Sequence, residues 1–306
     1  MAVQSTVRAG RRTGFRASSR PHSAPMSPAL RRGPAVRALQ YLALAGYVVF
    51  LGFPLLWMLS TAFKSAPELV SLHPTVIPRK PTLSNFSAAF REQDLVHAAW
   101  NSVRVSAAAS LLTTAIAVPA AYALARYRTV LRRGALTWIL VSQVFPVILI
   151  VVPLFLILQQ LGAGNSLTGL TLAYIVWLLP FALWMLQSYV RAIPVELEQA
   201  AAVDGAGKLR TLVSVVLPLL GPGIAVTVMF TFVSAWNEFF FALVLLQSPQ
   251  LATLPLTLAR FVGSEGIVAL GPLAAGALLA TLPGLLVFAL LQRRISSGLL
   301  SGAVKG

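Results

Sequence analysis

Six long apolar stretches, separated by shorter polar segments, dominate the pattern of hydrophobic and polar positions in this chain. A helix needs about 20 residues to cross the hydrocarbon core of a bilayer, and each stretch is at least that long. The predicted spans are residues 38–63, 100–125, 135–158, 167–189, 219–245 and 267–291. We therefore predict an all-α membrane protein with six transmembrane helices.

The long polar segment in the second half, residues 194–218, predicts two short helices joined by a sharp turn. A proline suits the first turn of a helix, and acids near that turn are stabilised by the helix dipole. Alanines extend the helix, and an Asp-Gly pair ends it because glycine tolerates a left-handed conformation. These positions are filled by Pro194, Glu196, Glu198, Ala200, Ala201, Ala202, Asp204 and Gly205.

The outer connection between the first two predicted spans, residues 64–99, is long and rich in proline. Its four prolines prevent a continuous helix before about Ser84. We expect a short surface helix to begin there, formed by Asn85, Phe86, Ala89 and Phe90.

Composition supports the membrane class. Hydrophobic residues make up 57% of the 306 residues and charged residues only 10%, which is far from the balance of a soluble domain. The chain has no cysteine, so disulfides, thiolate metal sites and cysteine nucleophiles are excluded.

In a soluble protein, a net charge of +16 would suggest nucleic acid as a partner. Here the positive charges gather in the amino-terminal segment and in a few of the loops, which indicates a basic tail and the orientation of a membrane protein instead. Residues 1–37 contain eight arginines and no acid. Because this segment is rich in Ser, Pro and Ala and has no apolar core, we predict a disordered, basic cytoplasmic tail, followed by a membrane domain over residues 38–306. An organellar transit peptide is the alternative.

The distribution of all 24 basic residues orients the spans. With the amino terminus inside, the inner segments, including the tail, carry 18 Lys and Arg residues and the outer half carries 6. The positive-inside rule then predicts that both termini and the loop at residues 191–218 are cytoplasmic.

The sequence offers no catalytic or metal centre. His22 lies in the tail, and His73 and His97 lie in or beside the outer loop, so no predicted span contains a histidine. A phosphate-binding Gly-x-x-x-x-Gly-Lys-Ser/Thr loop is also missing, because Gly207-Lys208 is followed by Leu209. We predict no catalytic residue, no metal and no cofactor bound by this chain.

Trp236-Asn237-Glu238 places the only acid inside any predicted span. Counted from Leu219 along a continuous helix, Glu238 lies roughly 28 Å up the span, close to the outer interface. It either lines the outer mouth of a pathway or bonds a neighbouring helix, and we favour the structural role. Sugar sites combine aromatic rings with amides and hydroxyls. Aromatic residues are also common at membrane–water interfaces that bind no sugar, so the residue types alone do not decide. The candidates are Trp100, Asn101, Tyr174, Trp177, Trp184 and Trp236.

Small residues recur at every fourth position of the last span, at Gly276, Ala280 and Gly284. Such a stripe permits close helix contact. We expect packing within the chain rather than a dimer interface.

One ordered motif lies in the polar segment. Glu-Leu-Glu-Gln-Ala-Ala-Ala-Val-Asp-Gly-Ala begins at Glu196, and Leu217-Pro218 follows about a dozen residues after the glycine. This order resembles the Glu-Ala-Ala loop of binding-protein-dependent ABC importer permeases. The resemblance implies that Glu196, Glu198, Gln199, Ala200, Ala201, Asp204 and Gly205 belong to a coupling helix that docks on a cytoplasmic ATPase. The family usually has Glu where this chain has Gln199, so docking here would use a neutral hydrogen bond or recruit Glu196 or Glu198.

Other segments are similar to the same family, chiefly the final Gly-Leu-x-x-Gly-Ala-Val-Lys-Gly at residues 298–306 and Tyr-Ala-Leu-Ala-Arg at residues 122–126. The tail resembles that of maltose-type second permease subunits of the carbohydrate class. The resemblance implies a type I ABC importer permease in a bacterial plasma membrane. It further implies a second homologous permease, an ATPase dimer that uses the ATP, an extracytoplasmic sugar-binding protein and the lipid bilayer as partners, and no nucleic acid. The alternatives are a permease for glycerol phosphate or an oligopeptide, and a secondary carrier.

Overall fold

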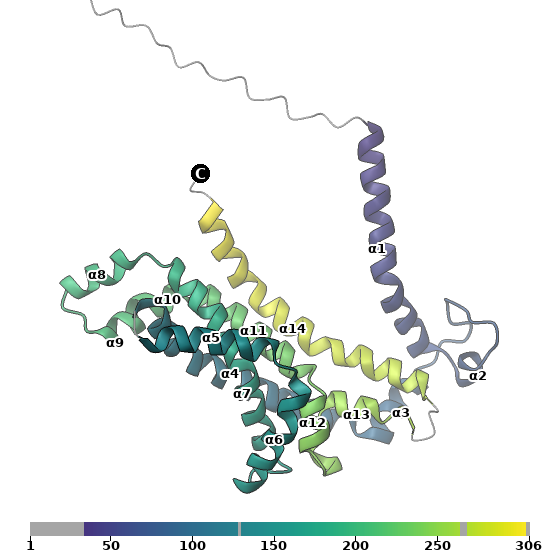
Figure 1. Ribbon diagram of the computed structural model, residues 1–306. Helices are drawn as coiled ribbons and strands as arrows, with labels where there is room; N and C mark the ends of the chain where they lie inside the picture. Colours follow the sequence, from purple (N-terminus) through teal and green to yellow (C-terminus); the bar gives the residue numbers. More distant parts are fainter. Residues whose placement is uncertain (1–33, 128–129, 264–267, 304–306) are drawn as a thin grey trace, which may run out of the picture. The chain divides into compact units, whose positions relative to one another are not determined.

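The computed structural model describes residues 34–127, 130–263 and 268–303, and over these ranges the protein is built from helices and loops (Figure 1). The longer helices are α1 Pro34–Phe63, α3 Ser84–Gln93, α4 Leu95–Arg126, α5 Val130–Val144, α6 Val147–Gln160, α7 Leu167–Ala192, α8 Val195–Val203, α11 Gly221–Trp236 and α14 Leu270–Ala303. The shorter ones are α2 Ala66–Leu69, α9 Lys208–Thr211, η1 Leu212–Val216, α10 Leu217–Leu219, α12 Phe240–Leu245, η2 Pro249–Leu251 and α13 Leu254–Ala259. This chain is an all-α membrane protein.

Four helices are long and apolar enough to cross a membrane: Val36–Phe63, Leu95–Arg126, Leu167–Ala192 and Leu270–Gln292. Two bent pairs, Arg132–Val144 with Val147–Gln160 and Lys208–Leu219 with Gly221–Trp236, also meet this test when each pair is taken together. The described residues therefore supply four spans, or up to six if each bent pair is one span. The second pair covers residues 208–236, so it begins inside the predicted polar segment and ends before the predicted end of the fifth span at residue 245.

The third predicted span is not one straight helix. We expected an unbroken helix over residues 135–158, but α5 and α6 meet at an angle of 107°. Pro146 is the cap residue before α6 and has an extended backbone. Proline has no amide proton and also restrains the residue before it, so the helical hydrogen bonds stop at Phe145.

The fifth predicted span, residues 219–245, is also broken. A bend of 74° separates the helices on either side of Leu220, and α11 ends at Trp236, before the separate helix α12. The assumption of one continuous helix from Leu219 through Glu238 was therefore wrong, although α11 is unbroken from Gly221 to Trp236. Glu238 lies in the break.

Some element boundaries also differ from the prediction. α4 begins at Leu95, five residues before the predicted start of the second span, and α1 begins at Pro34, within the segment predicted as tail. Residues 1–33 of that tail and residues 304–306 of the terminal motif lie outside the described residues. Contacts divide the chain at Pro54 into two compact units, one ending at Phe53 and the other reaching the carboxyl terminus.

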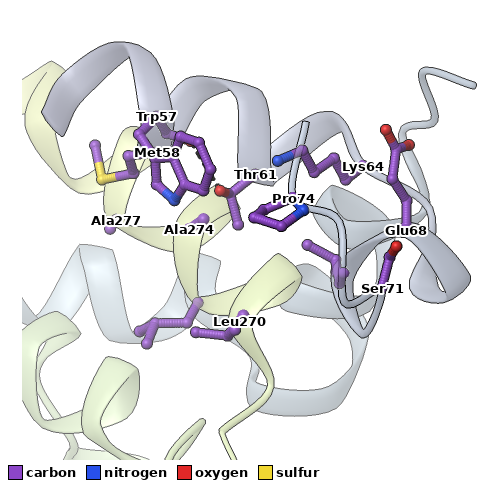
Figure 2. A pocket seen from close by; sticks show the side chains of 12 residues that line it. Trp57, Met58, Thr61, Lys64, Glu68, Ser71, Pro74, Leu270, Ala274 and Ala277 are labelled. Atoms are coloured by element: carbon purple, nitrogen blue, oxygen red, sulfur yellow. Dashed lines mark hydrogen bonds between the residues drawn. The ribbon is translucent and has the colours of Figure 1, made fainter. Parts of the chain in front are cut away.

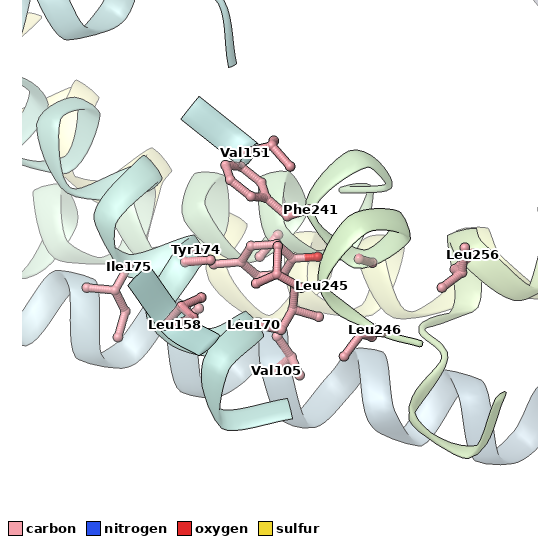
Figure 3. Close-up of a cluster of buried hydrophobic side chains, with 14 of the residues drawn as sticks. Val105, Val151, Leu158, Leu170, Tyr174, Ile175, Phe241, Leu245, Leu246 and Leu256 are labelled. Atoms are coloured by element: carbon pink, nitrogen blue, oxygen red, sulfur yellow. The ribbon is translucent and has the colours of Figure 1, made fainter. Parts of the chain in front are cut away.

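Within the larger unit, α4 packs along α7 and α11. Its buried face is rich in alanine, with Ala109, Ala117 and Ala121 fully buried, so neighbouring helices approach its backbone closely. At one end of α7, Tyr174 and Phe241 form the centre of an apolar cluster (Figure 3). At the other end, Leu186 and Val190 of α7 belong to a second cluster, which includes Ala117 and Ala121 and reaches the polar loop.

The small-residue stripe packs within the chain at two of its three positions. A Cβ added at Gly276 would lie 2.6 Å from the Leu258 side chain, and the Ala280 carbonyl accepts a hydrogen bond from the Trp236 indole. Gly284 faces open space. The short helix expected from Ser84 is present as α3, and Asn85 on it is buried rather than exposed.

Candidate functional site

The predicted helix in the polar segment is present as α8, Val195–Val203. Pro194 is its cap residue, and Glu196 and Glu198 lie in its first turn. Gly205 follows with φ of +80°, and the amides of Gly205 and Ala206 donate to carbonyls in the last turn of the helix. A left-handed glycine is the usual way to satisfy a helix end, so this turn has the geometry that the sequence predicted.

The chain returns through α9 and the π-helix η1 before it enters α10. Thr211 is buried, and its hydroxyl donates to the Gly207 carbonyl at 3.2 Å. The segment is thus a helix, a turn and a second helix, which we call the polar loop (residues 194–219).

The tip of the polar loop exposes apolar side chains. Val203 is 88% exposed and Leu209 is 75% exposed, one on each side of the turn. Glu196, Gln199 and Asp204 are exposed beside them.

Glu198 differs from its neighbours because it is bound within the chain. Its Oε1 atom lies 2.6 Å from Nε of Arg126, at the end of α4, and its Oε2 atom accepts a hydrogen bond of 2.8 Å from the Tyr122 hydroxyl. Nη2 of Arg126 also donates to the Ile193 carbonyl at 2.7 Å. The Arg126 and Glu198 side chains are only 14% and 11% exposed, so water screens this pair little.

The second arm of the loop contacts the same end of α4. The Lys208 ammonium lies 5.0 Å from the centre of the Tyr127 ring, within the range of a cation–π interaction. Tyr127 in turn packs edge-on against Tyr122. We call these five residues (Tyr122, Arg126, Tyr127, Glu198 and Lys208) the latch; they join both arms of the polar loop to α4.

The sequence did not predict the latch. Arg126 was counted as an inner positive charge and as the last residue of a family-like motif, and Glu198 was assigned to a docking partner outside the chain. The two residues are 72 positions apart, and no local pattern links them. The available signal was that Tyr122 and Arg126 both belong to a motif that resembles the same family as the polar loop.

Trp236, Asn237 and Glu238 have separate roles at the break after α11. Trp236 is buried and its indole donates to the Ala280 carbonyl at 3.0 Å. Asn237 is exposed and bonds its own helix at Val233. Glu238 is buried and accepts hydrogen bonds from the Tyr174 hydroxyl at 2.9 Å and from the amide of Phe241 at 2.8 Å, so it caps α12 and joins it to α7.

The aromatic and amide candidates for a sugar site do not act as one group. Tyr174 and Trp177 lie together, with ring centres 6.4 Å apart. Asn101 is buried and donates to the carbonyls of Gln250 and Ala252. Trp100 and Trp184 are about half exposed. Among the described residues, no group of three or more His, Cys, Asp or Glu residues is close enough to hold a metal ion.

Comparison with known proteins identifies the family. Residues 115–300 match the family described as binding-protein-dependent transport system inner membrane component. The chain belongs to this family. Membership is consistent with the multi-pass helical fold, and it makes the protein a permease subunit.

Similar proteins include ORF1 of Streptomyces antibioticus, whose name describes it as an ABC transporter permease protein. It is 60% identical to this chain, and the match covers 75% of this chain and all of ORF1. The diacetylchitobiose uptake permease DasC of Streptomyces coelicolor is 38% identical over 85% of this chain and 94% of its own. A solved chain from a bacterial ABC transporter involved in alginate import superposes with a TM-score of 0.74 at 20% identity, covering 87% of this chain and 99% of that one. This last match supports the type I ABC importer permease fold.

Proposed function

We propose that this chain is the permease subunit of an ATP-driven carbohydrate importer in a bacterial plasma membrane. The observation that carries the proposal is the similarity to sugar permeases over nearly the whole chain. Besides DasC, the trehalose/maltose permease MalG of Thermococcus litoralis is 34% identical over 83% of this chain and 91% of its own. The transported solute is a sugar or an oligosaccharide.

The permease works with separate partners in this proposal. A second homologous permease completes the membrane pathway, an ATPase dimer hydrolyses ATP, and an extracytoplasmic binding protein delivers the sugar. The family description supports the binding protein. The exposed Val203 and Leu209 at the tip of the polar loop support docking to a cytoplasmic subunit. Both termini and the polar loop face the cytoplasm.

The latch gives a physical route from ATP hydrolysis to the membrane helices. When the ATPase dimer closes, it moves the polar loop as a unit, since α8 and α9 are joined by a short turn. The Glu198–Arg126 pair and the Lys208–Tyr127 contact pass this movement to α4. Because α4 packs along α7 and α11, these helices rock together and alternate the access of a central pathway.

Co-purification tests the assignment. The tagged protein is extracted from its native membrane in a mild detergent, the accompanying chains are identified, and ATPase activity is measured with candidate sugars such as diacetylchitobiose, trehalose and maltose. We expect a second permease, an ATPase and activity that a sugar-loaded binding protein stimulates. Repeated recovery of the protein alone, with uptake that collapses on adding a protonophore while ATP stays high, would instead indicate a secondary carrier.

A further inference from the structure

A cavity of about 490 Å³ opens between the end of α1, the loop after it and the start of α14 (Figure 2). Its volume is within the range of small-molecule sites. One wall is apolar and comes from α14, with Leu270, Leu273, Ala274 and Ala277. The opposite wall carries a tryptophan ring, a cation, a carboxylate and two hydroxyls, from Trp57, Lys64, Glu68, Thr61 and Ser71.

Lys64 is the unusual residue of this cavity. Only 3% of its surface is exposed, yet among the described residues its ammonium has no carboxylate within 4 Å and no hydrogen-bond acceptor. Its recorded contact is with the Trp57 ring, 4.4 Å from the ring centre, and Figure 2 shows the ammonium directed toward Thr61 and Trp57. The ammonium is not among the described side-chain atoms that are closed off from solvent without a partner, so it opens into the cavity that Lys64 lines, where a ligand would supply its acceptors.

Glu68 supplies the complementary requirement. Its Oε1 atom accepts hydrogen bonds from the Thr75 hydroxyl at 2.8 Å and the Arg79 amide at 2.9 Å. These bonds, the Arg79 amide first, lower the pKa of Glu68 below its usual value, so it is a carboxylate at neutral pH. Its Oε2 atom is shielded from water and has no hydrogen-bond partner, so Glu68 acts on a ligand in the cavity through its negative charge.

The walls that carry these groups are fixed in place. The Asn85 side chain on α3 donates to the carbonyls of Ala62 and Lys64 at 3.0 and 2.8 Å, and the Thr82 amide donates to Phe63 at 2.9 Å. Asn85 also lies so close to Gly271 of α14 that a Cβ there would be 2.3 Å from its oxygen. The end of α1 and the start of α14 are therefore held together through one buried amide, and the cavity is a preformed feature.

The groups select a class of ligand. A phosphate or carboxylate would satisfy Lys64 but would be repelled by Glu68. An uncharged sugar ring meets both conditions, because its hydroxyl oxygens accept from the ammonium and it carries no negative charge for Glu68 to repel, while its apolar C–H surface packs against the wall of α14. We propose that this cavity is an outer-face subsite that holds one ring of the transported sugar. The proposal rests on the proposed function and its orientation, which place the end of α1 at the outer face.

Cysteine protection tests the subsite, and the natural absence of cysteine makes the test clean. Ser71→Cys places one thiol at the cavity wall, and the neighbouring Val70→Cys places one on an 82% exposed residue that does not line the cavity. Each importer is assembled with its partners in phosphatidylcholine nanodiscs, and thiol labelling is timed with diacetylchitobiose, trehalose or maltose. At about ten times the sugar concentration that half-fills the cavity, about nine in ten cavities are occupied, so labelling of Ser71→Cys should slow roughly tenfold. Labelling of Val70→Cys should stay unchanged.

Lys64→Met provides the second arm. It removes a buried charge and keeps the length of the side chain, so folding should tolerate it. Added to Ser71→Cys, it should abolish the protection by sugar.

Three results would overturn the subsite. The first is that sugar does not slow the labelling of Ser71→Cys in an importer that still transports sugar. The second is that sugar slows the labelling equally with and without Lys64. The third is that inorganic phosphate or phosphatidylglycerol nanodiscs slow the labelling and sugar does not, which would make the cavity an anion site. Failure of the wild-type importer to transport any sugar, while it transports another solute, would instead overturn the proposed function.

Discussion

The Glu198–Arg126 pair allows a direct test of how the polar loop is attached. Glu198→Gln keeps the shape of the side chain but removes its charge. The amide offers one oxygen where the carboxylate offered two, so either the Tyr122 hydroxyl or Nε of Arg126 loses its acceptor.

The expected size of the effect follows from the contacts. A hydrogen bond to a charged group contributes about 1.5 to 3 kcal/mol, and both side chains are mostly buried. Losing one such bond should weaken the attachment of the loop by about 2 kcal/mol, which raises the detached population roughly 30-fold. In a double-mutant cycle with Arg126→Gln, we expect a coupling energy of about 1 to 2 kcal/mol.

Hydrogen exchange measured by mass spectrometry on the permease in nanodiscs reports this detachment. The amides of residues 195–211 should exchange faster in Glu198→Gln. Glu196→Gln is the matched control, since Glu196 is an exposed acid on the same helix, and its exchange should match the wild type. Equal exchange in both variants would refute the latch.

Three further predictions concern the turn, a helix contact and the break after α11. Gly205→Val forces a β-branched residue to a φ of +80°, at a cost of about 1 to 3 kcal/mol; uptake should fall while membrane insertion is kept, and Gly207→Val, at a φ of −68°, should transport normally. Gly223→Ala places a Cβ 2.6 Å from a tyrosine ring of α7 and should lower stability in detergent by about 1 to 3 kcal/mol, whereas Gly221→Ala meets no atom within 4 Å and should have little effect. Glu238→Ala leaves buried donors without an acceptor and should destabilise by at least about 2 kcal/mol; Glu238→Gln should recover part of this, and a similar melting temperature for both variants would contradict the capping role.

The polar loop was predictable because its signals are local. Pro194, the acids of the first turn and Gly205 each act through neighbouring backbone, and the structure has the helix and the turn where the sequence placed them. The alternation of apolar and polar segments likewise gave the helical class and the approximate spans.

The bends were not predictable from proline content alone. Pro146 interrupts the third predicted span, but Pro119, Pro153 and Pro180 lie inside continuous helices. Whether a proline breaks a helix depends on whether neighbouring side chains and helices satisfy the freed carbonyl groups, and that is a tertiary property.

The partners of the buried polar residues were beyond the sequence for a related reason. Glu198 with Arg126, Glu238 with Tyr174 and Asn85 with the end of α1 are pairings between residues at least 21 positions apart. The sequence singled out Glu198 and Glu238, but only the packing of α4, α7 and α14 decides which groups meet.

Cross-linking at the tip of the polar loop tests the central claim most directly. Val203→Cys puts a single thiol on an 88% exposed position of the tip, and Leu72→Cys puts one on a 94% exposed position of the loop after α1. In the assembled importer, a short thiol-to-amine cross-linker should join Val203→Cys to the ATPase subunit, with a yield that changes on adding ATP, and should not join Leu72→Cys to it. An actively transporting importer in which Val203→Cys never cross-links to the ATPase, or in which Leu72→Cys does, would contradict the account.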